Sequence, residues 1–295
     1  MKRNVVIGLG EALWDVFPEG KKIGGAPANF AYHVSQFGLE SAVVSAVGRD
    51  ALGDEILENF SGKQLQCAIE RVDYPTGTVQ VVLDENGVPT YDIREGVAWD
   101  NIPLSPPIET LARRASAVCF GSLAQRSPVS RATIKRVLDL MDEGGEHVYK
   151  IFDVNLRQNY FTKERLEESM KRANVLKIND EEIAVVSRLF EISGIDLRDK
   201  CRCLIDRFGF EILILTCGVN GSYVFTPGEE SFCETPRVEV NDTVGAGDSF
   251  TGAFCAMLLH GKTVREAHLR AVEVSAYVCT QAGAMPTLPP KLTEV

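Results

Sequence analysis

Short apolar runs alternate with amphipathic segments along most of this 295-residue chain, and this alternation restricts the fold more than any other feature. Residues 5–9, for example, form a continuous apolar run between glycines, which is typical of a strand buried on both faces. Repeated strand–helix units imply a mainly parallel sheet with helices on both faces. We expect strands near residues 5–9, 41–47, 117–120, 148–154, 175–178 and 212–216, and helices near 27–38, 50–60, 130–141, 181–190, 197–208, 250–258 and 264–280, with another that ends near 173.

One segment departs from this alternation. Residues 78–83 alternate apolar and polar side chains, residues 84–87 have the composition of a turn, and residues 90–93 return as a second strand. Residues 14–17 are also strand-like, and they precede a predicted turn at 18–20. The pattern therefore predicts an antiparallel ribbon inserted into an otherwise parallel α/β chain.

Polar residues follow several of the predicted strands at the points where these strands end. Because the carboxyl ends of parallel strands meet along one rim of a sheet, ligands of such folds bind there. We therefore expect a single site along this rim, built from Asp15 and from residues 121–122, 153–157, 177–182, 216–218 and 242–248.

A glycine turn lies at the start of the helix predicted near residues 250–258. Gly245 and Gly247 allow the backbone to turn sharply and to approach a ligand closely, and the N–H groups at a helix start attract an anion. Asp248 stands at the mouth of this turn, where a carboxylate would repel a bound phosphate. It would act as a base that takes a proton from a hydroxyl attacking that phosphate, or it would only cap the helix, and the residues alone leave both interpretations open.

Four further polar residues each have a functional and a structural interpretation. Asn29 follows a second glycine turn at residues 24–25, and it would bind a ligand hydroxyl or stabilise the turn. Asn179 and Glu182 are three residues apart on the first turn of a helix, where they would hold hydrated Mg²⁺ beside phosphates or form a capping arrangement with a solvated acidic face. Arg157, at a strand end, would bind an anionic group or be a surface charge.

The composition limits the classes of partner. A net charge of −10 argues against nucleic acid or an anionic membrane. The eight cysteines are scattered without a Cys-x-x-Cys pair, which favours free core thiols in a reducing cytoplasm over a metal site. The start of the chain lacks the length of a signal peptide, and no apolar stretch is long enough to span a membrane. We therefore expect a cytoplasmic protein with small-molecule ligands.

Two stretches resemble the ribokinase-like (PfkB) family of carbohydrate kinases, namely residues 24–53, which begin at the second glycine turn, and residues 242–254. Within that family, residues 10–15 and 153–157 are similar to the forms found in fructokinases. The order of the other motifs agrees with the family, so the resemblance covers essentially the whole chain.

The resemblance implies a fold and an activity. It implies a single domain over residues 1–295, with a three-layer α/β/α core, a mainly parallel central sheet and a small β-sheet lid formed by residues of about 12–24 and 73–98. The activity would be ATP-dependent phosphorylation of a sugar hydroxyl, most similar to that of fructokinase, with Mg²⁺ and in some members K⁺, and a homodimer would form through the lid. Alternatives are a kinase for ribose or a keto-gluconate, an inactive sugar-binding regulator, and more remotely an NAD-binding enzyme.

The resemblance also assigns roles to individual residues. Asp248 would be the catalytic base, with an anion hole formed by the N–H groups of Gly245, Ala246 and Gly247. The positions that bind the sugar match Asp15, Gly25, Asn29 and Arg157. The positions for Mg²⁺ and the phosphates of ATP match Asn179 and Glu182, and the remaining ATP positions match Thr216, Gly218 and Gly221. A monovalent cation beside the anion hole would be bound by Asp242, Val244, Val278, Gln281, Gly283 and Thr287.

Overall fold

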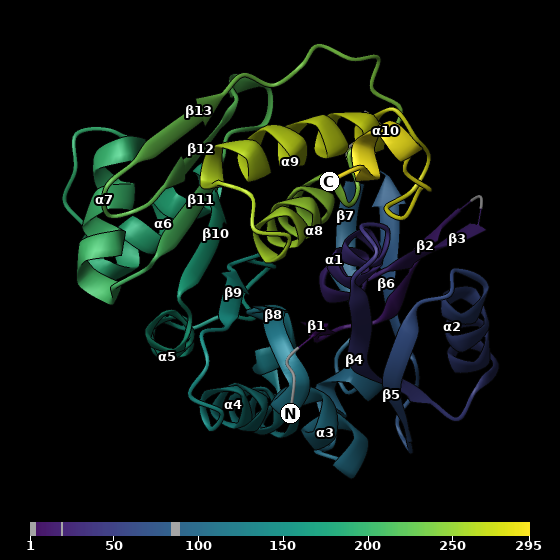
Figure 1. Cartoon of the computed structure of the whole chain (residues 1–295). Coiled ribbons are helices and arrows are strands. Elements are labelled where there is room, and N and C mark those ends of the chain that lie inside the picture. Colours follow the sequence, from purple (N-terminus) through teal and green to yellow (C-terminus); the bar gives the residue numbers. More distant parts are fainter. Residues whose placement is uncertain (1–3, 19, 84–88) are drawn as a thin grey trace.

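The computed structural model describes residues 4–18, 20–83 and 89–295, and within them one large sheet organises the chain (Figure 1). Its parallel strands are β1 (Val5–Leu9), β4 (Glu40–Gly48), β5 (Gln66–Val72), β8 (Ala115–Gly121), β9 (Tyr149–Asp153), β10 (Val175–Asn179) and β11 (Ile212–Thr216). Two antiparallel strands, β12 (Ser222–Phe225) and β13 (Glu230–Cys233), extend one edge. The order across the sheet is β13-β12-β11-β10-β9-β8-β1-β4-β5.

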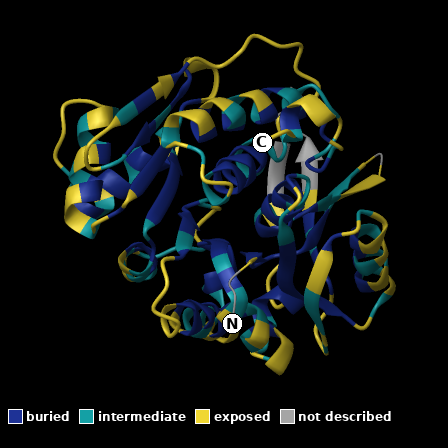
Figure 2. Cartoon of the chain, viewed as in Figure 1, coloured by how far each residue is buried: buried dark blue, intermediate teal, exposed yellow. Residues whose placement is uncertain are grey.

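Helices cover both faces of this sheet. One face carries α1 (Ala26–Ser35), α2 (Ala51–Gly62), α8 (Ala246–Leu259), α9 (Val264–Cys279) and the short α10 (Pro290–Thr293). The other carries α3 (Pro106–Arg114), α4 (Pro128–Asp142), α5 (Lys163–Arg172), α6 (Asp180–Phe190) and α7 (Leu197–Phe208). Successive strand residues point to opposite faces, so Val5 and Ile7 join one hydrophobic core while Val6 joins the other. Figure 2 shows the strands between these layers as buried.

A smaller sheet is formed by the segments that depart from the alternation. It contains β2 (Leu13–Phe17), β3 (Gly20–Gly24), β6 (Gly77–Leu83) and β7 (Pro89–Ile93), in the order β3-β2-β6-β7. The β6–β7 pair is antiparallel, as the predicted ribbon requires. The β2–β3 pair is also antiparallel, whereas β2 and β6 are parallel. The turn predicted at residues 84–87 lies outside the described residues, as does residue 19 of the turn predicted at 18–20. That this sheet acts as a lid stays a prediction.

Several elements were not expected from the pattern, among them α3, β5 and β13. The helix α3 begins with two prolines, and only Ile108 and Ala112 of its residues are buried, so its apolar face is narrow. The strand β5 lies at the edge of the large sheet and has no fully buried residue, and it lacks the apolar run of a central strand. The strand β13 is too short to show a period. Within the described part of the chain, no helix combines the length and hydropathy that a membrane crossing requires.

The strand order reverses direction at β1. From β1 the chain adds β4 and β5 on one side, and it then returns to place β8, β9, β10 and β11 in succession on the other side. Helices of opposite faces therefore diverge at the boundary between β1 and β8. The crevice at the carboxyl ends of such neighbouring strands is where open α/β sheets bind ligands.

Candidate active site

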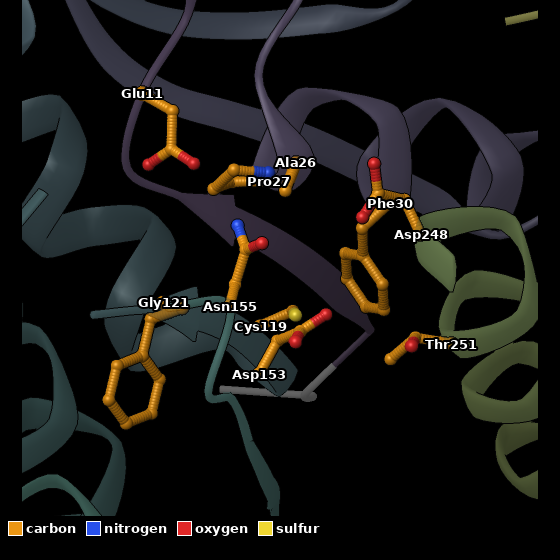
Figure 3. A pocket seen from close by; sticks show the side chains of 11 residues that line it. Glu11, Ala26, Pro27, Phe30, Cys119, Gly121, Asp153, Asn155, Asp248 and Thr251 are labelled. Carbon is orange, nitrogen blue, oxygen red and sulfur yellow. The ribbon is translucent and has the colours of Figure 1, made fainter. Parts of the chain in front are cut away.

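A pocket lies at this reversal point (Figure 3). It is bounded by the segment after β1, by the ends of β8 and β9, and by the beginnings of α1 and α8. Its lining residues are Glu11, Ala26, Pro27, Phe30, Cys119, Phe120, Gly121, Asp153, Asn155, Asp248 and Thr251. The fold thus brings together residues from the two ends of the chain, including Asp248.

Asp248 lies in the first turn of α8, but it does not cap that helix. The N-cap residue is Gly245, and α8 has no side-chain cap, so the capping interpretation of Asp248 is wrong. Its Oδ2 instead accepts a hydrogen bond of 2.7 Å from Nδ2 of Asn29, which lies on α1. Burial, and then the charge of Asp153, raise the pKa of the Asp248 carboxyl to about 6, although the bond from Asn29 acts in the opposite direction.

The glycine turn before α8 has one strained position and one that is not strained. Gly245 has φ 78°, in the left-handed region that favours glycine, and a Cβ there would lie 2.6 Å from Cβ of Ala284. Gly247 has no positive φ, so of the two glycines only Gly245 adopts a conformation that favours glycine. A Cβ on Gly247 would instead lie 3.1 Å from Nζ of Lys177. The N–H groups at this helix start therefore lie beside a buried ammonium.

Lys177 and Asp153 form a buried ion pair for which we predicted no role. They are neighbours across β10 and β9, with 3.2 Å between Nζ and Oδ1, and their exposed fractions are 7% and 4%. Burial by itself would lower the pKa of Lys177. The negative charges of Asp153 and Glu182 have the larger combined effect, so the pKa of this lysine is raised above its usual value. The sequence contains a signal that could have identified this pair. A lysine lies inside one apolar strand, and the neighbouring strand ends in aspartate.

The residues expected around the sugar occupy two different settings. Asp15 lies on β2, opposite Lys22 on β3, and burial raises the pKa of its carboxyl to about 6 although Arg157 and Lys22 oppose this shift. A Cβ on Gly24 would fall 2.4 Å from Oδ2 of Asp15, so the chain passes close to this carboxylate. The next residue, Gly25, is the N-cap of α1, and Arg157 itself is exposed.

Asn179 and Glu182 form a capping box at the start of α6. Oδ1 of Asn179 accepts a 2.8 Å bond from the Glu182 N–H, and Oε2 of Glu182 accepts a 3.0 Å bond from the Asn179 N–H. The other oxygen, Oε1, accepts from the Leu156 N–H at 2.9 Å. The two side chains therefore form the predicted capping arrangement. The prediction that Glu182 belongs to a solvated acidic face is wrong, because this residue is buried.

This arrangement fits Mg²⁺ only through water. Both carboxylate oxygens of Glu182 and the amide oxygen of Asn179 already accept main-chain N–H groups, so an ion near them would be held by bridging waters. Among the described residues, no group of three or more His, Cys, Asp or Glu side chains is arranged to hold a metal ion. The sequence expectation of an indirect role is compatible with this geometry.

The residues expected on the nucleotide side continue the same rim. Thr216, at the end of β11, is the cross-strand neighbour of Asn179. Gly218 begins the short 3₁₀ helix η3 (Gly218–Asn220), and Gly221 closes the turn, where its carbonyl accepts a 2.9 Å bond from the Cys217 N–H. The turn leaves a solvent-accessible rim after β11.

Two of the residues expected at a monovalent cation, Val244 and Gly283, contact a third, Asp242. Its carboxylate accepts the N–H groups of Val244 at 3.0 Å and Gly283 at 3.2 Å, and Nζ of Lys22 lies 3.2 Å from its Oδ2. The remaining residues lie at the end of α9 and in the loop that follows, and they are Val278, Gln281 and Thr287. Because Lys22 already supplies a positive charge at Asp242, K⁺ would compete with this ammonium.

Comparison with known proteins identifies the family. A family model described as pfkB family carbohydrate kinase matches residues 10–291. A fructokinase from Klebsiella pneumoniae is 30% identical over 306 residues, which cover 96% of this chain and 95% of the relative. An ATP-dependent 6-phosphofructokinase from Thermoanaerobacterium thermosaccharolyticum is 27% identical over 306 residues, which cover 98% and 92%.

A solved structure confirms the fold class. The crystal structure of a fructokinase with bound ATP from Xylella fastidiosa superposes with a TM-score of 0.84 at 21% identity, over 97% of this chain and 95% of that one. The ribokinase-like α/β architecture with a second, smaller sheet is therefore correct as predicted. The family model matches most of the chain and the fold agrees with it, so this chain belongs to the PfkB family of carbohydrate kinases and is an ATP-dependent sugar kinase.

Proposed function

We propose that this sugar kinase phosphorylates a primary hydroxyl of fructose, with Asp248 as the general base. The observation that carries this proposal is the Asp248 carboxylate at the N-terminus of α8, next to the Gly245 turn and 2.7 Å from Asn29. Identity with the Klebsiella fructokinase over almost the full length of both chains supports fructose as the acceptor. A ribose or keto-gluconate kinase remains the alternative activity.

Each residue of the site has its own role in the proposed reaction. Asp248 accepts the proton of the attacking hydroxyl, while Nδ2 of Asn29 holds its carboxylate in place. Oδ1 of Asn29 is buried and has no partner within the described residues, so it accepts a second hydroxyl of the sugar. The N–H groups of Gly245, Ala246 and Gly247 stabilise charge on the transferred phosphoryl group, and the nearby Lys177 ammonium adds to that field.

ATP would lie along the rim from Asn179 to Gly221, on the opposite side of the glycine turn from the small sheet. Asn179 and Glu182 would hold Mg²⁺ through water beside the phosphates. When bound, this ion neutralises charge that develops during phosphoryl transfer. We further propose that the sheet β3-β2-β6-β7 covers the sugar, because its strand β2 carries the half-buried Asp15.

The test is ADP release, coupled to a spectrophotometric readout, with ATP and a panel of fructose, ribose and 2-keto-gluconate. We expect kcat/KM to be highest for fructose. Absence of ADP release with every sugar would contradict the proposal, and so would binding of sugar without turnover, which is the behaviour of an inactive regulator.

The pH dependence follows from the raised pKa of Asp248. A base must be ionised to accept a proton, and the pKa of this carboxyl is about 6, so activity should be present above pH 6 and lost as the pH falls through it. At pH 5 we expect kcat/KM about tenfold below its plateau, since one unit below the pKa leaves roughly a tenth of the base ionised. A pH–rate profile from 5 to 9 measures this, with melting temperatures at each pH as the control. A kcat/KM that stays at its plateau value down to pH 5 would contradict the assignment.

Asp15 provides a test of the sugar side. A carboxylate in this setting accepts charge-assisted hydrogen bonds, which contribute roughly 1.5–3 kcal/mol each. We expect Asp15→Ala to raise the KM for fructose about tenfold or more while the KM for ATP changes little. Both constants are measured on the same variant. A rise confined to ATP would place Asp15 outside the sugar pocket, and small parallel changes would mean that it only stabilises its turn.

A further inference from the structure

One carboxyl group in the pocket has no role in the chemistry described above. Glu11 follows β1 and is 2% exposed, and its Oε2 is buried without a hydrogen-bond partner within the described residues. Figure 3 shows its carboxyl group directed into the pocket that also holds Asp248. A buried polar oxygen without a partner is costly, and such groups are retained where a ligand satisfies them.

The charges around the pocket are unbalanced. Three acidic side chains line it, from Glu11, Asp153 and Asp248, whereas no Lys, Arg or His is among its lining residues. Asp153 is paired with Lys177 at 3.2 Å, and Asp248 accepts a bond from Asn29. Neither Glu11 nor Asp248 forms an ion pair within the described residues, and of the three acids Glu11 alone has a buried carboxylate oxygen without a hydrogen-bond partner there.

The pKa of Glu11 agrees with this imbalance. Burial first, and then the charges of Asp248 and Asp153, raise it to about 7, although a hydrogen bond from the backbone of Glu11 itself and the charge of Arg157 act in the opposite direction. Arg157 is exposed and does not line the pocket, so it does not neutralise Glu11 by contact.

The chemistry of a suitable ligand follows from these contacts. A carboxyl group accepts hydrogen bonds from hydroxyls when it is ionised, and it both donates and accepts when it is protonated, so Glu11 is suited to a hydroxyl in either state. A carboxylate or phosphate on the ligand would face Asp248 and Glu11, neither of which is paired with a cation within the described residues, in a medium of low dielectric constant, where repulsion between ionised groups is strong.

We propose that Glu11 binds a hydroxyl of the acceptor other than the one that is phosphorylated, and that this acidic pocket restricts the enzyme to sugars without a carboxylate or phosphate group. This inference rests on the proposed kinase activity and adds to it the class of acceptor. It separates this chain from a kinase for sugar acids and from one for sugar phosphates, because both would require a cation in the pocket. Glu11 is a specificity residue here, and Asp248 remains the base.

The experiment compares fructose, 2-keto-gluconate and fructose 6-phosphate as acceptors for the full-length enzyme, by ADP release and, without nucleotide, by calorimetric binding. We expect kcat/KM of the wild type to be at least about 100-fold higher for fructose than for either anionic acceptor. Glu11→Gln keeps the shape and hydrogen-bonding capacity but removes the charge. Glu11→Gln should reduce the ratio of kcat/KM for fructose to kcat/KM for an anionic acceptor about tenfold, while the KM for fructose changes less than about threefold. Glu11→Ala, which also removes the hydrogen-bonding groups, should raise the KM for fructose about tenfold.

The matched control is Glu58→Gln, which removes the charge of an exposed glutamate on α2 and should leave the ratio unchanged. Turnover of an anionic acceptor as efficient as that of fructose would overturn the inference while leaving the kinase activity established. An unchanged ratio in Glu11→Gln, which is nearly isosteric and should fold, would also overturn it. No turnover of any acceptor would instead contradict the proposed function, so the two failures are distinguishable.

Discussion

Replacement of Asp248 with asparagine is expected to lower kcat by about 10²–10⁴-fold, the usual contribution of a general base. The amide cannot accept the proton of the attacking hydroxyl, although it has nearly the same size as the carboxyl group. The Asn29–Asp248 contact of 2.7 Å can persist, because Nδ2 of Asn29 can donate to an amide oxygen. Steady-state kinetics with ATP and fructose measure the loss, and calorimetric titration measures fructose binding, which should stay close to that of the wild type.

A matched control for this variant is Asp206→Asn, which makes the same chemical change at an exposed position on α7. It should keep wild-type kinetics. If Asp248→Asn retained a kcat within about threefold of the wild type, the proton would have to leave by another route and Asp248 would not be the base. A large loss of fructose binding with unchanged kcat would give Asp248 a binding role instead.

Gly245→Val is expected to reduce kcat/KM by at least about 100-fold, comparable to the loss of an anion-hole donor. Two effects combine at this residue. Its φ of 78° disfavours any β-branched side chain, and an added Cβ would fall 2.6 Å from Cβ and 2.8 Å from Cα of Ala284. Relief of this overlap requires the loop around Ala284 or the start of α8 to move, and either movement would displace the N–H groups that we propose to face the phosphoryl group.

Gly209→Val separates strain from function. Gly209 is the C-cap of α7 with φ 74°, and an added Cβ would meet no heavy atom within 4 Å. Both variants should therefore lose stability from the positive φ, as thermal unfolding would show, but only Gly245→Val should lose activity. Full activity in Gly245→Val would mean that the anion hole lies elsewhere. Gly247→Val should have a smaller effect, because the atom that it approaches is Nζ at the end of the Lys177 side chain.

Lys22 connects the small sheet to the loop that precedes the proposed anion hole. This lysine is opposite Asp15 in the β2–β3 pair, and its ammonium lies 3.2 Å from Oδ2 of Asp242. Asp242 in turn accepts the N–H of Val244, directly before the glycine turn. An ionic contact thus joins the strand pair that carries Asp15 to the loop that opens into α8, although the exposure of Lys22 makes its contribution to stability small.

Local sequence rules were sufficient for the fold class and for the positions of most elements. The helix α7 has the predicted bounds, Leu197–Phe208, because Asp196 caps its start and Gly209 ends it in the left-handed conformation. Asp50 likewise caps α2 through the Gly53 N–H, as its place before the helical pattern indicated. Such signals act over a few residues, so they can be recognised without knowledge of the rest of the chain.

The sequence by itself therefore determined the α/β class, the rim at the carboxyl ends of the strands, and the glycine turn with Asp248 at the start of α8. Only the tertiary structure decided which side chains meet there. Asn29 contacts Asp248 across 219 positions, Lys177 neutralises Asp153 across 24, and Glu11 is left without a cation beside them. Periodicity and capping depend on the backbone nearby, whereas the pairing and burial of charges depend on how distant elements pack, and the pKa values of the site follow from that packing.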